Sequence, residues 1–342
     1  MPITRNASTE FPTTESGSNA REAAVSAPES HPGKKQIPAS LSALSEIGHK
    51  SGTDLNASPR RRRTSSLSEA DRRLASYLFA RSVDRRPPDL DELKMLKEGH
   101  ASVEEARRLL PWGRGNVESD LTRTKNESLY RAWAMRSMAP LGLHPVQRAA
   151  LAVYAGGGNC GEHADVVMHV HAAKLAIGDR LHDVNNPGGD HAAVIHEGGG
   201  ERPDIVLDAW GNIGALNVRD SKYHGDSRDL ETIYTYTSDI GETATEQFYR
   251  NVQQVNSDEH DKFDSELERV RSLNIKSVGS RDSNVVEEGF ARRISERISS
   301  TDPAINHVNA VNAARSIGAS ERAAVRAAPM IIDDAANMTR GN

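Results

Sequence analysis

"GGGNCGEHADVV", Gly156–Val167, holds the only cysteine of the chain, Cys160. Three glycines and an asparagine lead into the cysteine. After Gly161, apolar residues recur at helical spacing from Ala164 to Leu175. The stretch therefore predicts a glycine loop that runs into the N-terminus of an amphipathic helix, which packs against the core and ends at Gly178.

A cysteine in that position is favoured as a nucleophile over an inert buried thiol. The thiolate is the reactive form, and the unpaired amides at a helix N-terminus stabilise negative charge by roughly 0.3–1 kcal/mol. The same amides can stabilise a tetrahedral oxyanion, and glycines let a substrate backbone approach. Asn159 and Gly161 are the supporting candidates. The Asn159 side chain either donates to the oxyanion or caps the helix, and the cap is slightly favoured.

A base and a group that orients it are expected from two strands downstream. "GGDHAAVIHEG" (188–198) places His191 at the start of a strand, and "PDIVLDAWGN" (203–212) places Asp208 at the end of the next. In an antiparallel hairpin these positions share one sheet edge. His196 lies five residues from His191 in the same strand and faces the opposite side. A helix carrying Cys160 on this sheet gives a papain-like or transglutaminase-like order of helix, strand and strand.

Other readings of these motifs remain open. Cys160 and His163 with a third ligand could hold zinc, but zinc sites are usually richer in ligands, so neither a metal nor a cofactor is expected. Trp210 either walls the site or belongs to the core. In the turn "PWGRGN", Arg114 and Asn116 either bind a cofactor or partner, or serve a turn that its glycines stabilise.

The pattern along the chain predicts an α+β fold. Helices are expected after the N-cap Ser68, in "DLDELKMLKEG" ending at Gly99, in "SVEEARRLL", over 119–138 and from Pro145. The hairpin follows, and then helices from about 229 to 254 and in the C-terminal part. From the N-terminus we expect a disordered leader, 1–66; a helical N-proximal region, 67–140; a cysteine catalytic core, 141–255; and a helical C-terminal region with a disordered end, 256–342.

Composition narrows the classes of function. The net charge of -5 argues against bulk binding of nucleic acid, and one cysteine cannot form an internal disulfide. No apolar run approaches the ~20 residues of a membrane span, and Pro2 stands where an N-myristoylation signal needs glycine. The Ser/Thr-rich leader suits a type III secretion channel. Its "RRRRTSS" (60–66) is a solvated boundary, a nuclear address, a membrane patch or a kinase site.

Several of these motifs together resemble the AvrPphE/HopX/XopE family of plant-pathogen type III effectors. They are "GNCGEHA", "DH", "VLDAW", "RSVDRRPPDLDELKML", "EARRLLPWGRGN" and "EGFARRISERI". The resemblance runs from about Leu74 to about Ala328. It implies a transglutaminase-like superfamily fold whose triad falls on Cys160, His191 and Asp208. It also implies export by the type III machinery and action on a host protein in the plant cell cytoplasm, or in its nucleus.

The chemistry expected of such a site is an acyl-enzyme on Cys160, with His191 moving protons and Asp208 orienting the imidazole. Resolution by water gives proteolysis or deamidation, and resolution by an amine gives transglutamination. A cysteine protease is the favoured outcome. The alternative from another class is a non-catalytic module that binds a host protein.

Overall fold

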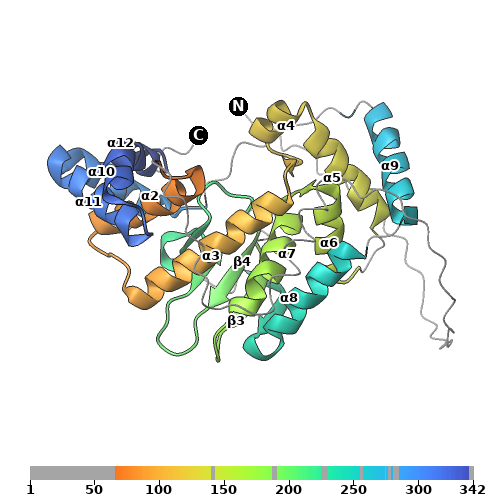
Figure 1. Ribbon diagram of the computed structural model, residues 1–342, viewed down its shortest axis with the longest axis horizontal. Helices are drawn as coiled ribbons and strands as arrows, with labels where there is room; N and C mark the ends of the chain where they lie inside the picture. Colours follow the sequence, from red (N-terminus) through yellow and green to blue (C-terminus); the bar gives the residue numbers. More distant parts are fainter. Residues whose placement is uncertain are drawn as a thin grey trace, which may run out of the picture. The chain divides into compact units, whose positions relative to one another are not determined.

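Helix α7 (Cys160–His171) lies at the centre of the fold, against an antiparallel five-stranded sheet (Figure 1). The sheet has the order β6-β5-β4-β3-β7. Its strands are β3 (Arg180–Asn186), β4 (His191–Glu197), β5 (Ile205–Leu207), β6 (Ala215–Asn217) and β7 (Glu231–Thr237). The α+β class expected from the sequence is confirmed.

This computed structural model describes residues 66–139, 143–186, 191–224, 230–254, 257–273, 275, 279 and 285–338. Residues 1–65 of the expected leader, with its arginine run, lie outside the described residues, and so do residues 339–342 of the expected C-terminal region. All the described residues belong to one compact unit that begins at Pro59. No helix among them is long and apolar enough to cross a membrane.

Helix α7 is buried on nearly every side, from Glu162 to His171, and is not amphipathic as its spacing predicted. The reason is its surroundings. The sheet covers one side, and α3 (Leu90–Leu109), α6 (Pro145–Ala155) and α8 (Ser238–Gln253) pack around the rest.

The end of α7 also differs from the expectation. The α-helix ends at His171 and continues as the 3-10 turn Ala172–Lys174, well before Gly178. His169 and His171, two residues apart near the end of α7, are both fully buried.

The predicted hairpin is present as β4 and β5, with Val194 opposite Leu207. The sequence analysis did not predict the other three strands of this sheet, or the short strands Gly113–Arg114 and Gly157–Gly158. β3 ends at Asn186, within "NNPGGD". β7, "ETIYTYT", falls where a helix was expected, because its β-branched and aromatic residues suit a strand and its start at Glu231 pairs with β3.

Two helix boundaries are also corrected. Gly99 does not end a helix, because α3 runs on through it to Leu109. A Cβ at Gly99 would lie 2.5 Å from a methyl carbon of Leu207, so this glycine allows α3 to lie close against β5. The helix expected over 119–138 is two helices, α4 (Glu118–Thr124) and α5 (Glu127–Met138), separated by left-handed backbone at Lys125 and Asn126.

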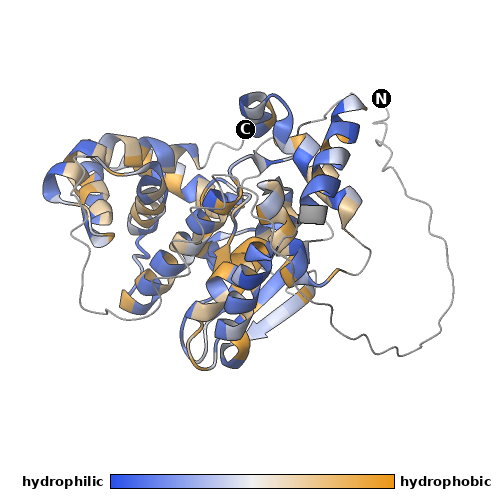
Figure 2. Cartoon of the chain, turned by 45° about the vertical axis from the view of Figure 1, so that its right-hand side comes forward, coloured by the Kyte–Doolittle hydropathy of each residue, from blue (hydrophilic) through white to orange (hydrophobic). Residues whose placement is uncertain are grey.

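The remaining helices pack outside the sheet. α2 (Glu69–Val83) contacts α10 (Glu288–Ser300), α11 (Pro303–Ser316) and α12 (Glu321–Asn337), and α9 (Ser257–Ser272) packs on α5. Apolar residues gather on the strands and on the inner faces of the helices, whereas the outer faces are hydrophilic (Figure 2).

Candidate functional site

The glycine loop before Cys160 is shaped by a short pairing of two strands. β1 (Gly113–Arg114) runs parallel to β2 (Gly157–Gly158), with Gly113 opposite Gly157. A Cβ at Gly157 would lie 2.8 Å from the Gly113 carbonyl oxygen, so the pairing requires a residue without one. Gly156 has a φ of 72° and ends α6 in the left-handed region. The loop therefore turns the chain sharply from α6 into α7.

Cys160 is the first residue of α7 and is partly exposed. Its first-turn amides have no acceptor within the helix. Asn159 is the N-cap, and its backbone N–H donates to Glu162 Oε2 at 2.7 Å. The Asn159 side chain faces the helix in capping-box fashion, but its Oδ1 is buried without a well-formed hydrogen bond. The N-cap that the sequence favoured therefore depends mainly on the Glu162 carboxylate, which accepts the Asn159 backbone N–H.

The residue that follows Cys160 has open space beside it. A Cβ built on Gly161 would meet nothing within 4 Å. Arg136, which sequence reasoning missed, binds the Glu162 carboxylate through two nitrogens at 3.0 and 2.8 Å. Burial lowers the pKa of Arg136, but the charges of Glu162 and Cys160 outweigh it and raise that pKa. The thiol therefore has a guanidinium nearby, and open space lies beside the next residue.

His191 is brought to both Cys160 and Asp208. Its Nε2 lies 2.8 Å from Asp208 Oδ2, and Cys160 is within hydrogen-bonding reach of the ring, which leaves Nδ1 for the sulfur. Burial lowers the pKa of His191. Hydrogen bonds to Asp208 and Cys160, with their charges, outweigh burial and raise it to about 10. The site therefore favours an imidazolium next to Cys160.

Asp208 directly follows β5 and is fully buried. Its Oδ1 accepts the backbone N–H groups of Trp210 and Gly211 at 2.9 and 2.8 Å. Burial raises the pKa of Asp208, but its bond to His191 and the charge of that ring outweigh burial and lower it. The turn thus holds an ionised carboxylate with one oxygen free for His191.

Trp210 packs against the imidazole, with ring centroids 4.9 Å apart. Its indole Nε1 donates to Asn116 Oδ1 at 3.1 Å, and its backbone N–H is bound to Asp208. Both of its N–H groups are therefore engaged. Trp210 walls the site and supports His191, and its indole is not free to donate to an oxyanion.

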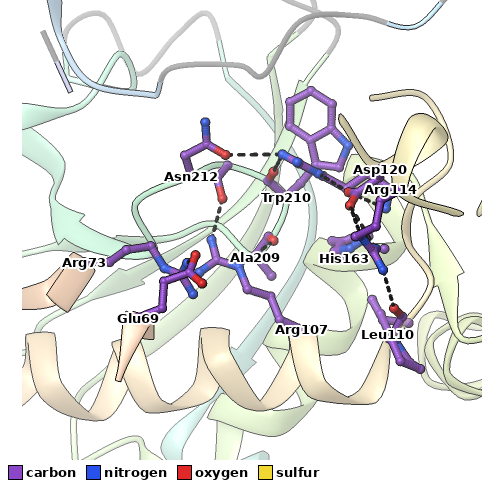
Figure 3. A pocket seen from close by; sticks show the side chains of 14 residues that line it. Glu69, Arg73, Arg107, Leu110, Arg114, Asp120, His163, Ala209, Trp210 and Asn212 are labelled. Carbon is purple, nitrogen blue, oxygen red and sulfur yellow. Dashed lines mark hydrogen bonds and ion pairs between the residues drawn. The ribbon is translucent and has the colours of Figure 1, made fainter. Parts of the chain in front are cut away.

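Arg114 and Asn116, which the sequence left open between partner binding and a turn, both contact the loop that carries Asp208. Arg114 Nη1 donates to the Trp210 carbonyl oxygen at 2.9 Å, and its Nε pairs with Asp120 at 2.6 Å. From the opposite side, Arg107 on α3 donates to backbone carbonyls of the same loop. Figure 3 shows the two arginines on either side of this loop.

A polar cavity of about 280 Å³ lies beside the loop (Figure 3). Arg73, Arg107, Arg114 and Arg123 line it together with Trp210, and each of the four guanidinium groups pairs with a carboxylate. The cavity is thus bordered by an ion-paired framework that supports the Asp208 turn.

His163 and His196 bind partners other than Cys160. Nδ1 of His163 lies 2.9 Å from the Asn159 carbonyl oxygen, and burial lowers the pKa of His163 to about 4. His196 Nδ1 lies 3.0 Å from His171 Nε2, at the far end of α7. Within the described ranges, no cluster of three or more His, Cys, Asp or Glu side chains could hold a metal ion.

Tyr223 is a further residue at this site that sequence reasoning missed. Its ring lies against His191, with centroids 6.4 Å apart, on a turn held by Ser221. No local motif marks it, because the chain reaches the site only after β6 and the 3-10 turn Val218–Asp220.

Comparisons of the chain with models of protein families, with curated proteins and with solved structures found no significant match.

Proposed function

We propose that the protein is a thiol enzyme in which Cys160, His191 and Asp208 form a catalytic triad on a papain-like or transglutaminase-like core. The observation that carries the proposal is the His191 ring itself, which takes Asp208 at Nε2 and has Cys160 in hydrogen-bonding reach. An imidazolium at this position stabilises the thiolate, which is the reactive form.

The proposed chemistry begins with attack of the Cys160 thiolate on a carbonyl or carboxamide carbon. The S–C bond forms as the C=O electron pair moves to oxygen, and collapse of that intermediate expels the leaving group with a proton from His191. An acyl-enzyme results. Water or an amine, deprotonated by His191, then resolves it. Proteolysis is the favoured outcome, and deamidation and transglutamination use the same intermediate.

The biological part of the proposal rests on the resemblance of "GNCGEHA", "VLDAW" and the flanking segments to plant-pathogen effectors. On this proposal the protein is a virulence factor, exported by the type III machinery and acting on a host plant protein. The leader (1–66) serves export and is dispensable for the chemistry. A chain starting at Ser68 should keep its thiol chemistry and fail to leave the bacterium.

The chemical test uses the single cysteine, because any thiol adduct then reports on Cys160 alone. With p-nitrophenyl acetate, the protein should release about one equivalent of p-nitrophenolate in a burst and gain one acetyl group. Cys160→Ala should abolish both while keeping its circular dichroism spectrum. A wild-type protein that fails to acylate faster than a denatured control would overturn the proposal.

The outcome on protein substrates is read by mass spectrometry of plant extracts incubated with wild type and with Cys160→Ala. New termini indicate proteolysis, a mass gain on Gln or Asn indicates deamidation, and crosslinked peptides indicate transglutamination. If Cys160→Ala retains full activity in plant tissue, the protein is instead a non-catalytic binding module.

A further inference from the structure

Tyr223 is a buried hydroxyl group with nothing to bond among the described residues. Its side chain is 7% exposed, and Oη has no hydrogen-bond partner. Leaving a buried polar group unpaired costs roughly 1–3 kcal/mol, so buried hydroxyl groups are normally satisfied. An unsatisfied one beside a reactive group is therefore a candidate for a role in the reaction.

The surroundings of this hydroxyl group are those of the candidate triad. The Tyr223 ring packs on one part of His191 while Trp210 packs on another, with centroid separations of 6.4 and 4.9 Å. Burial, followed by the negative charges of Asp208 and Cys160, raises the pKa of Tyr223 well above its usual range. The phenol consequently stays protonated at every working pH and can act as a hydrogen-bond donor.

The position of Tyr223 is fixed by the fold. Its backbone N–H donates to Ser221 Oγ at 3.1 Å, and Ser221 forms an antiparallel bridge with Val286. The neighbouring Lys222 N–H donates to the Val285 carbonyl oxygen at 2.9 Å. The ring is thus held by the segment that leads into α10 rather than by a partner for its hydroxyl group.

We propose that the Tyr223 hydroxyl group donates a hydrogen bond to the oxygen of the acyl group that is attached to Cys160. The proposal rests on the thiol chemistry proposed above. When Sγ attacks the carbonyl carbon, the C=O pair moves to this oxygen, and the phenol supplies a donor that has no other partner. The first-turn amides of α7 supply the remaining donors.

Two other side-chain N–H groups near the site already have partners. The Trp210 indole N–H is committed to Asn116, and His163 Nδ1 to the Asn159 carbonyl oxygen. Tyr223 is the side chain that combines burial, a lack of hydrogen-bonding partners within the described ranges and proximity to both Cys160 and Asp208.

The test compares two reactions of the same sulfur in Tyr223→Phe. Acylation by p-nitrophenyl acetate passes through an oxyanion, with S–C bond formation followed by expulsion of p-nitrophenolate. Alkylation by iodoacetamide displaces iodide at an sp³ carbon and forms no oxyanion. Tyr223→Phe should slow acylation by about 10²-fold or more, the effect of a lost oxyanion donor, and leave alkylation within about twofold of wild type.

Stability gives a second, independent readout. Phenylalanine removes an unsatisfied hydroxyl group, so Tyr223→Phe should melt at the wild-type temperature or above. Tyr236→Phe is the matched control. Its hydroxyl group lies 2.8 Å from His169 Nε2, so that variant should lose stability and acylate normally.

The outcomes separate the two proposals. If wild type acylates and Tyr223→Phe acylates equally fast, the donor role is overturned and the triad stands. If Tyr223→Phe slows acylation and alkylation in parallel, Tyr223 positions the thiolate and the donor role is again overturned. If wild type itself does not acylate, the proposed thiol chemistry is overturned, and so is the donor role that depends on it.

Discussion

A histidine lies next to an aspartate at each end of strand β4, but the pKa values of the two histidines are shifted in opposite directions. At its start, His191 binds Asp208, and the pKa of His191 is raised to about 10. At its other end, His196 Nε2 lies 3.0 Å from Asp179 Oδ2, yet burial, as the largest influence, lowers the pKa of His196. A histidine next to a carboxylate is therefore not by itself a catalytic base.

The neighbours account for the difference. Asp179 accepts from Arg202 and from two backbone N–H groups, and the other nitrogen of His196 faces the neutral ring of His171. Asp208 Oδ2, in contrast, has His191 as its hydrogen-bond partner, and the other side of that ring faces Cys160. Asp208 on one side of the ring and Cys160 on the other both raise the pKa of His191.

The most severe test of this comparison replaces the two histidines one at a time. His191→Gln removes the imidazolium beside Cys160, so turnover of p-nitrophenyl acetate should fall by about 10⁴-fold or more, as in other triads. Iodoacetamide alkylation at pH 6 should fall about 10²-fold, toward the reactivity of a free thiol. His196→Gln should leave both rates within about twofold and lower the melting temperature.

That pair of variants is informative in both directions. Mass spectrometry after iodoacetamide gives the labelled fraction of Cys160 directly, since the chain has no other thiol. Equal loss of labelling in the two variants, or loss in His196→Gln alone, would mean that the base has been assigned to the wrong end of β4.

Replacing Asp208 and Asp179 one at a time should again distinguish the two ends of β4, with a somewhat smaller effect on rate than replacing the histidines. Asp208→Asn presents an amide N–H to His191 Nε2, which forces the proton onto Nδ1 and spoils the base facing Cys160. Turnover should fall by roughly 10²- to 10⁴-fold with the fold retained. Asp179→Asn leaves Arg202 without its carboxylate and should cost about 3 kcal/mol of stability at an unchanged rate. Steady-state kinetics with chemical denaturation of both variants measures each effect.

The two ends should also respond oppositely to pH. The pKa of His191 is raised on folding, so its stabilising contribution is complete below about pH 6.5, the usual histidine value, and is lost as the pH rises toward 10. Burial, with the charge of His196 and then of Lys174, lowers the pKa of His171. The pKa of His196 is lowered as well, so the contribution of this pair is present above about pH 6.5 and is lost on acidification.

Melting temperatures from pH 5 to pH 10 test these signs. His191→Gln should flatten the alkaline decline, and His196→Gln should flatten the acid one. A wild-type protein whose stability is constant from pH 7 to pH 10 would contradict the charge state assigned to His191.

Local patterns predicted part of this fold because the responsible forces are local. Pro145 begins a helix and His191 begins a strand, as capping and alternation indicate. The prediction that a helix ends at Gly99 was wrong because this glycine is required by a tertiary contact. Gly99 sits inside α3 because Leu207 approaches it, and no neighbouring residue in the sequence records that contact.

The candidate site divides in the same way. Cys160, His191 and Asp208 could be proposed from sequence because each lies at the end of a regular element. Tyr223 and Arg136 could not, since they reach the site through turns and helices whose placement depends on the whole core. The contacts of Asn116 with Trp210 likewise became visible only once β1 was placed beside β2.

The smallest effect is expected from residues that do not touch His191 or His196 but bond to a neighbouring side chain. Asn116→Ala removes the acceptor of the Trp210 indole N–H, and Trp210 is the wall against which His191 packs. One lost hydrogen bond is worth about 1 kcal/mol, so acylation should slow a few-fold through a less well-held imidazole. Ser102→Ala is the counterpart at the other end, because its Oγ lies 2.9 Å from His171 Nδ1. It should cost a similar amount of stability and leave acylation unchanged. A rate loss in Ser102→Ala equal to that in Asn116→Ala would show that the histidines at both ends of β4 act on Cys160, and the difference between the two ends would then not hold.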